Sequence, residues 1–222
     1  MAQKIMSQKE KFVLSYSGGK DAILACYRAV QSGGRPMGAV TMFDRENACS
    51  WFHRLPETLL KQAAQSLGFP IRMIDTTSEH YTAGFENALK SFVSQGAESV
   101  VFGDVDIQEH YDWCAARCRN VGIQSVFPLW NNDRRNVVRE MIDAGFQAMI
   151  TTIDATKISE RFLGKTLTHE IITQIADEGI DPCGENGEYH TFVYNGPLFR
   201  NKIDWTSGSP VQSGNRIHLP LT

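Results

Sequence analysis

The sequence lacks the features that would place it in several specialised classes of protein. No apolar run approaches the ~20 residues that a membrane-spanning helix requires. The opening segment MAQKIMSQKEK is polar, and no apolar stretch follows it that would form a signal peptide. There is no basic excess, because 22 Lys and Arg stand against 25 Asp and Glu, for a formal net charge of -3. A broad nucleic-acid surface would require a basic face. The sequence therefore predicts a cytoplasmic protein that binds a small molecule, with neither membrane nor nucleic acid as a partner.

The pattern of the cysteines is not that of a disulfide framework. The five cysteines are odd in number and scattered along the chain, which favours reduced thiols. Cys114 and Cys118 would share one face of a helix, but no second cysteine pair supports a zinc site, so packing is the favoured interpretation. Internal repeats and low-complexity segments are also lacking. At 222 residues and 42% hydrophobic content, the chain can bury a substantial core.

Short β-rich runs alternate with amphipathic stretches through the first half of the chain. The runs predict strands near 12–16, 37–43, 71–74 and 99–103, and the amphipathic stretches predict helices near 21–32, 56–67, 80–95 and 107–121. This alternation is typical of an α/β fold, in which a parallel sheet carries helices on both faces.

After a further strand at 125–127, the pattern changes, and we place a domain boundary there. The expected domains are 1–128 and a smaller α+β domain at 129–222. In the second domain, the segment TLTHEIITQIADEG predicts a helix with Thr166 or Thr168 as its N-cap, and strands are expected on either side of it in the chain.

The turn between the first strand and the first helix, within LSYSGGKDAIL, carries the strongest functional signal. Unpaired N–H groups at a helix start attract anions. Gly18 and Gly19 let the main chain approach an anion closely, and Lys20 supplies a positive charge. Ser17 adds a hydroxyl donor, and Asp21 is a candidate ligand for Mg²⁺ against bound phosphates. The sequence thus predicts a phosphate-binding loop.

Two common phosphate loops are excluded by the spacing. A Walker A loop needs a glycine where this chain has Leu14, and Ser or Thr where it has Asp21. The dinucleotide fingerprint is absent because Gly18 and Gly19 are adjacent.

Ligands of open parallel sheets gather beyond the carboxyl ends of the strands. We therefore expect Ser15, Met42, Gly103 and Asp104, which lie at or near such ends, to line one nucleotide-binding crevice together with the loop.

The run S-G-G-K-D resembles the pyrophosphate-binding loop of the PP-loop ATP pyrophosphatases, which split ATP into AMP and pyrophosphate to activate a carboxyl or carbonyl oxygen. The resemblance implies a HUP-type, Rossmann-like fold, with ATP and Mg²⁺ as cofactors. One departure from the family is Ala22, because serine is usual there. The change removes one hydroxyl contact to phosphate and leaves Ser17 to supply it.

A second group of functional candidates lies in DPCGENGEYHTFVYNGPLF, positions 181–199. Glu185 and Glu188 bracket a glycine-containing turn, and His190 follows Glu188 on the same face of a strand. Together with FLGKTL at 162–167 and FPLW at 127–130, this segment resembles the diphthine–ammonia ligase family. In archaea and eukaryotes, that family completes diphthamide on translation elongation factor 2. The resemblance spans nearly the whole chain.

The resemblance implies an AMP-forming amide ligase, with an ATP-binding domain followed by an acceptor-binding, catalytic domain. A carboxylate attacks the α-phosphate of ATP, and ammonia then displaces AMP from the acyl-adenylate. Lys20 and Asp21 would serve the leaving pyrophosphate. Glu185 and Glu188 would orient ammonium or accept its proton, and Lys165 would meet the acceptor carboxylate or a phosphate. The alternative is that both glutamates only hold the turn and that Lys165 is a surface residue.

In the middle of the chain, FGDVDIQEHYDWCAARC at 102–118 brings Asp104, Glu109 and His110 near the end of a strand. This form resembles a subgroup found in bacteria, which lack the diphthamide target, so the acceptor can be a different carboxylated small molecule or protein side chain. Ammonia is the second expected substrate. Aromatic residues near Trp51 and Trp130 would serve a homodimer interface as readily as a core.

Two other functions fit parts of the sequence. A non-catalytic sensor of adenine nucleotides is favoured by Ala22, and a PP-loop sulfurtransferase would use Cys183. The paired Glu185 and Glu188 favour the ligase, because nucleotide binding alone does not require them. His53 is a further candidate to reach the nucleotide or the acceptor, with a solvated loop histidine as the alternative.

Overall fold

The computed structural model describes residues 6–222, so the first residues of the polar opening segment lie outside the described part. The chain forms two compact units that interleave along the sequence. The first unit comprises the described residues up to Ser17, Asp21–Trp51 and Phe69–Asn131, and the second comprises Gly18–Lys20, Phe52–Gly68 and Asn132–Thr222. The second unit thus includes two segments from the N-terminal half. The division into domains 1–128 and 129–222 stays a prediction.

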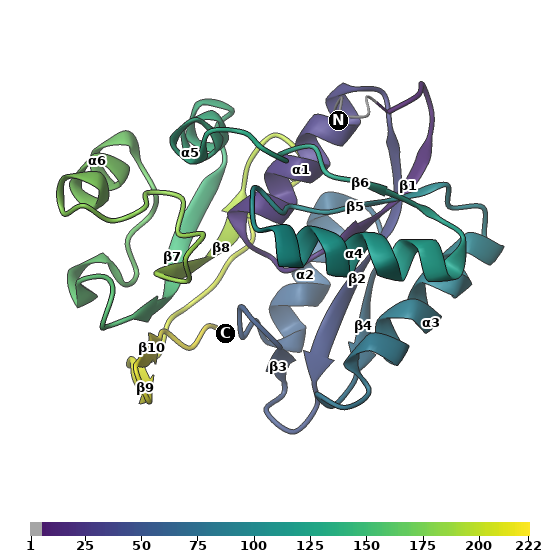
Figure 1. Cartoon of the computed structure of the whole chain (residues 1–222). Helices are drawn as coiled ribbons and strands as arrows, with labels where there is room; N and C mark the ends of the chain where they lie inside the picture. The colour runs from purple at the N-terminus through teal and green to yellow at the C-terminus, as the bar shows by residue number, and fades with distance from the viewer. Residues whose placement is uncertain (1–5) are drawn as a thin grey trace. The chain divides into compact units, whose positions relative to one another are not determined.

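The first unit is built on a mostly parallel sheet flanked by helices, as the sequence pattern predicts (Figure 1). The strands are β1 (Lys11–Ser15), β2 (Arg35–Asp44), β3 (Cys49–Ser50), β4 (Ile71–Asp75), β5 (Ser99–Val101) and β6 (Gln124–Val126). Strand β1 pairs with β2 and β5, β6 extends the sheet beyond β5, and β4 pairs with β2, all in parallel. The short β3 is antiparallel to β2. The helices of this unit are α1 (Lys20–Gln31), α3 (Tyr81–Ser94) and α4 (Gln108–Val121).

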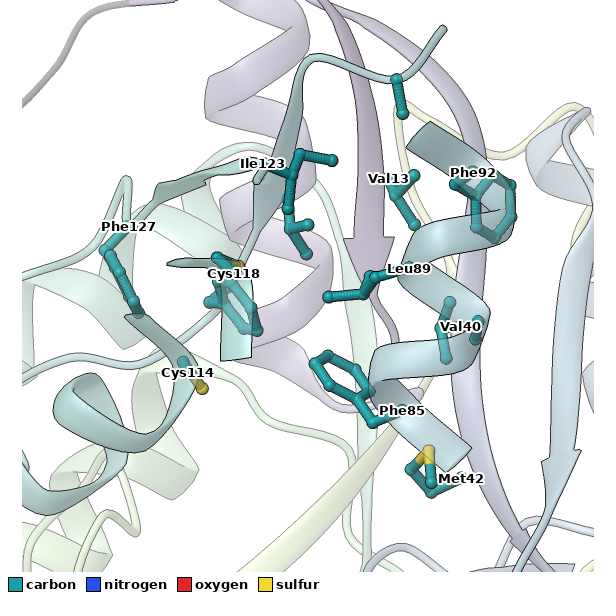
Figure 2. Close-up of a cluster of buried hydrophobic side chains, with 14 residues drawn as sticks. Val13, Val40, Met42, Phe85, Leu89, Phe92, Cys114, Cys118, Ile123 and Phe127 are labelled. Atoms are coloured by element: carbon teal, nitrogen blue, oxygen red, sulfur yellow. The ribbon is translucent and has the colours of Figure 1, made fainter. Parts of the chain in front are cut away.

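Helices α3 and α4 pack together over the sheet and enclose a hydrophobic core, shown in Figure 2. Phe85, Leu89 and Phe92 recur at helical spacing on α3 and are almost fully buried. Cys114 and Cys118 from α4 lie in the same cluster, so the packing interpretation of this pair is confirmed. Burial raises the pKa of Cys118 to about 12 and raises the pKa of Cys114 as well. Both side chains are therefore neutral thiols at physiological pH.

The second unit is an α+β structure with an antiparallel sheet in the order β8-β7-β10-β9. Its strands are β7 (Gln147–Asp154), β8 (Tyr189–Asn195), β9 (Val211–Ser213) and β10 (Arg216–His218), and its helices are α2 (Glu57–Leu67), α5 (Arg134–Asp143), α6 (His169–Asp177) and the 3-10 turn η1 (Glu160–Phe162). Thr168 is the N-cap of α6, because its hydroxyl accepts the Ile171 N–H at 3.2 Å. Within residues 6–222, no helix is both long and apolar enough to cross a membrane.

The core between α3 and the sheet yields a stability prediction. Phe92 is 1% exposed, so Phe92→Ala leaves a cavity and should lower the free energy of unfolding by about 3–5 kcal/mol. Val211 is 46% exposed, so Val211→Ala should change it by at most about 0.5 kcal/mol. Urea unfolding followed by circular dichroism measures both. Equal effects of the two substitutions would show that this cluster is not tightly packed.

Candidate functional site

The phosphate-loop candidate lies between the end of β1 at Ser15 and the start of α1 at Lys20. Gly18 has φ 86°, in the left-handed region that favours glycine. Two hydrogen bonds join the loop to β8: the Val193 N–H donates to the Gly18 carbonyl at 2.9 Å, and the Lys20 N–H donates to Thr191 Oγ1 at 3.0 Å. The loop is therefore fixed to a strand that lies far away in the sequence.

His53 is half-buried and lies against this loop. Whether it reaches a nucleotide or an acceptor stays a prediction. Its Nδ1 is 2.7 Å from the Thr191 carbonyl oxygen. Because a carbonyl can only accept, Nδ1 carries a proton and donates it. A Cβ atom added to Gly19 would collide with His53 Cε1 and would lie 3.1 Å from each ring nitrogen.

The Lys20 side chain is buried, with 5% of the residue exposed. Its Nζ lies 3.7 Å from Glu185 Oε1 and 5.6 Å from the centroid of the Tyr189 ring. A buried ammonium is costly unless a countercharge or an aromatic face accompanies it. Glu185 and Tyr189 meet this need, so the structure brings together the loop and the second group of candidates that the sequence singled out.

Asp181 organises the turn that carries Glu185. Its carboxylate accepts the Cys183 N–H at 2.9 Å and the Glu185 N–H at 3.2 Å. Arg134 NH1 donates to the same carboxylate at 2.7 Å and forms an ion pair with it. These bonds fix the main chain at Glu185, so its carboxylate is held in place against Lys20.

Glu188 is placed differently from Glu185. It is 6% exposed, and its carboxylate accepts the Asn186 N–H at 3.0 Å and the Asn186 side-chain amide at 3.1 Å. Lys157 Nζ also donates to the Asn186 carbonyl of this turn, at 2.6 Å. The described contacts of Glu188 are thus those of a residue that stabilises the turn, whereas Glu185 faces the loop.

His190 is held as a neutral imidazole beside His53. The two rings have their centroids 4.9 Å apart, and Arg216 NH1 lies 2.9 Å from His190 Nε2. A guanidinium only donates, so Nε2 accepts and the proton lies on Nδ1. Burial is the largest cause that lowers the pKa of His190 to about 2, and the nearby charges of His53, Arg216 and Lys20 contribute to the same shift. Sequence reasoning missed Arg216, because nothing in the local pattern of the C-terminal segment indicates a partner for His190.

Three of the other candidates lie near the carboxyl edge of the parallel sheet. Ser15 ends β1, Met42 lies near the end of β2, and Gly103 follows β5. A Cβ at Gly103 would lie 2.6 Å from the main chain of Asp21 and Ala22, so Gly103 permits close packing against the start of α1. That these residues line a crevice for a nucleotide stays a prediction.

Asp104 has two partners in the first unit. Its Oδ1 is 3.5 Å from His110 Nδ1, and its Oδ2 is 3.8 Å from Cys114 Sγ. Both His110 and the neighbouring Glu109 are exposed.

Lys165 is exposed. Among the contacts recorded for residues 6–222, only its main chain bonds to β7. Its carbonyl accepts the Ile150 N–H at 2.9 Å, and its N–H donates to the Phe162 carbonyl at 3.1 Å. The contacts of the loop described above do not involve Lys165, and its proposed role with the acceptor stays a prediction.

Two family models match the chain. One, described as the diphthamide synthase N-terminal domain, covers residues 10–125, and the other, described as the diphthamide synthase C-terminal domain, covers residues 133–214. Together they span the loop, both glutamates and His190. The subgroup that the Asp104 segment resembles is not distinguished by these matches.

Several curated proteins named diphthine–ammonia ligase are similar in sequence. The human protein is 37% identical over 90 residues, 39% of this chain and 34% of that protein. The Schizosaccharomyces pombe protein is 31% identical over 109 residues, 47% of this chain and 18% of that protein. The chain therefore aligns with well under half of the length of these two relatives. The Danio rerio protein is 26% identical over 214 residues, covering 84% of this chain and 83% of that protein.

A solved structure is also similar, though weakly. It is described as a predicted subunit of tRNA methyltransferase from Methanocaldococcus jannaschii. It shares 17% identity over 87% of this chain and all of that chain, with a TM-score of 0.46. A likeness this weak carries no functional argument.

The neutral state of His190 yields a prediction about pH. The folded chain does not protonate His190 until about pH 2, whereas the unfolded chain takes up this proton near pH 6.5. The free energy of unfolding should therefore fall as pH is lowered below about 6.5. His190→Gln keeps an acceptor for Arg216 and does not titrate. Between pH 7.5 and pH 5, it should lose up to about 2 kcal/mol less than the wild type in urea unfolding. Equal losses would contradict the neutral assignment.

Proposed function

We propose that this chain, which belongs to the diphthamide synthase family, is an ATP-dependent ligase that joins ammonia to a carboxylate. The observation that carries the proposal is the buried Lys20 in the glycine loop, held 3.7 Å from Glu185 of the C-terminal turn. A phosphate-binding loop alone would fit many nucleotide-binding proteins. The combination of a loop lysine with a fixed carboxylate supports a site in which phosphate release and amine chemistry take place together.

In the first step, an oxygen of the acceptor carboxylate attacks the α-phosphate of ATP. The bond between the α-phosphorus and the bridging oxygen breaks, so that pyrophosphate leaves and an acyl-adenylate remains. Negative charge develops on the leaving group, and Lys20 is the fixed cation that would stabilise it. The Gly18–Lys20 loop would bring its main chain close to the same phosphates.

Asp21 fits the requirement of a magnesium ligand, because Mg²⁺ prefers carboxylate oxygens and Asp21 directly follows Lys20 in the chain. When bound together with ATP, Mg²⁺ would neutralise charge on the phosphate oxygens.

In the second step, ammonia attacks the carbonyl carbon of the adenylate and AMP leaves, which produces an amide. Ammonia must be neutral to attack, so a base has to take the proton of ammonium or of the addition intermediate. We assign this role to Glu185, whose carboxylate lies 3.7 Å from Lys20 Nζ. Once Lys20 binds phosphate, the attraction between Lys20 and Glu185 weakens, and the carboxylate becomes available to the amine.

The acceptor is a carboxylated small molecule or protein side chain. The curated relatives are named for diphthine, and diphthine is accordingly the first acceptor to test. Cys114 and Cys118 do not fit a sulfur carrier, because burial raises the pKa values of both thiols and keeps them protonated. A sulfurtransferase would use Cys183, which is buried with its Sγ 3.7 Å from Glu185 Oε1. A nucleotide sensor without chemistry would bind ATP and release no pyrophosphate.

Lys20→Ala tests the role of the loop. Its removal should lower the rate of ATP cleavage to AMP and pyrophosphate by about 100-fold or more, because the leaving group loses its fixed cation. Nucleotide products are measured after incubation with ATP, Mg²⁺, ammonium and a diphthine peptide or cell extract. Lys61→Ala is the matched control, because Lys61 is exposed on α2 and pairs with Glu57 at 2.8 Å.

Three results would each contradict the proposal. Cleavage by Lys20→Ala at the wild-type rate would remove Lys20 from the site. ADP and phosphate as the products would mean that the loop belongs to another class of enzyme. Tight ATP binding without cleavage in every acceptor pool would favour the nucleotide sensor.

A comparison of Glu185→Gln with Glu188→Gln separates chemistry from turn stability. Glu185→Gln should leave ATP binding intact and slow amide formation about 100-fold, because it removes the base. Glu188→Gln should act mainly by weakening the bonds to Asn186, and so should lower the thermal midpoint. Incorporation of isotopically labelled ammonium and thermal unfolding provide the two readouts. An unchanged rate of amide formation in Glu185→Gln would exclude it as the base.

A further inference from the structure

We propose that His53 is a positioning residue that keeps the phosphate-binding loop in the conformation that binds phosphate. It does so by packing against Gly19 and by fixing Thr191, whose hydroxyl accepts the Lys20 N–H. The inference rests on the proposed function, because it takes the loop to be the site of the ATP phosphates. It assigns a role to a residue from the Phe52–Gly68 segment, which the chain places 33 positions after Lys20.

The first contact is a chain of two hydrogen bonds. His53 Nδ1 donates to the Thr191 carbonyl at 2.7 Å, and Thr191 Oγ1 accepts the Lys20 N–H at 3.0 Å. Thr191 is 2% exposed, so water does not replace either bond readily. His53 thereby fixes the main chain of Thr191, whose hydroxyl accepts the N–H of Lys20, the first residue of α1.

The second contact is steric. The two glycines of the loop are required for different reasons: Gly18 has φ 86°, whereas Gly19 is not among the glycines with positive φ in the described chain. What Gly19 supplies is space, because a Cβ there would collide with the edge of the His53 ring. The ring therefore blocks movement of the loop toward it, at the residue directly before Lys20.

The segment that carries His53 is itself held firmly. Leu55 is 1% exposed and anchors the chain, while the next residue after His53, Arg54, has φ 53°. A left-handed arginine is uncommon, and such conformations persist where the surrounding structure enforces them. The His190 ring has its centroid 4.9 Å from that of His53, and Arg216 NH1 donates to His190 Nε2. His53 is thus confined by several residues of one unit.

Three substitutions separate the hydrogen bond from simple bulk. His53→Asn places an amide N–H near the position of Nδ1 and keeps the bond to Thr191. His53→Gln places its amide near the position of Nε2, and His53→Ala removes the group. Isothermal titration with ATP and with pyrophosphate, each with Mg²⁺, should show about 5- to 10-fold weaker binding for the Ala and Gln variants. The affinity of the Asn variant should stay within about threefold of that of the wild type. If only the bulk of the ring mattered, Asn would not restore the affinity.

His169→Ala is the matched histidine control, because His169 is exposed and pairs only with the equally exposed Asp143 among the contacts recorded for the described chain. Its pyrophosphate affinity should equal that of the wild type. If His53→Ala does not fold, the Asn and Gln variants decide the question, since both keep a polar side chain of similar length.

A double-mutant cycle tests whether His53 acts through Thr191. Thr191→Val removes the hydroxyl that accepts the Lys20 N–H and keeps the shape of the side chain. If His53 acts through Thr191, the two losses of affinity should not add. The double variant that also carries His53→Ala should then bind pyrophosphate no more weakly than the single variant that has the lower affinity. If the two losses of pyrophosphate affinity multiply in full, His53 does not act through Thr191.

The outcomes distinguish the inference from the proposed function. A wild-type protein that binds neither ATP nor pyrophosphate would reject the proposed function and the inference together. A wild type that binds both, with His53→Ala and His53→Gln within twofold of it, would reject the inference alone. Weaker binding of the Ala and Gln variants with rescue by Asn, at unchanged thermal midpoints, is the result that supports it.

Discussion

The attachment of the glycine loop to β8 is the interaction on which the candidate site depends. The Lys20 N–H and the Thr191 hydroxyl belong to residues 171 positions apart, and a second bond joins Gly18 to Val193. The N–H groups at the start of a helix have no partner within the helix itself. Thr191 of β8 supplies an acceptor for one of them, the Lys20 N–H, and so fixes the start of α1; this N–H is then no longer a donor for an anion.

The buried charge of Lys20 gives the site its chemical character. Glu185 balances that charge in the structure, and the turn that carries Glu185 is stiffened by Asp181 and Arg134. An incoming phosphate would compete with a carboxylate that cannot move far. The contact between Lys20 and Glu185 thus links the glycine loop to the C-terminal turn within one unit.

The sequence predicts those features that depend on neighbours along the chain. The apolar run of β1, the helical spacing of α1 and the cap at Thr168 are local patterns, and the structure contains all three. The role of Glu188 in the turn and the bond between Arg216 and His190 depend on contacts that no local pattern reveals. The position of His53 depends on long-range packing in the same way. The strand β3 has only two residues, too few for an alternation to be recognised.

The interleaving of the two units has a consequence for how the protein can be divided. No single cut separates them, because Gly18–Lys20 and Phe52–Gly68 belong with residues from Asn132 onward. A fragment that ends at Asn131 retains the glycine loop and loses both of its β8 partners, and the complementary fragment retains β8 and has no loop to hold. Chimeras made by exchanging C-terminal halves between relatives would therefore combine the glycine loop of one protein with the β8 partners of another, rather than attach a new specificity module to an intact candidate site.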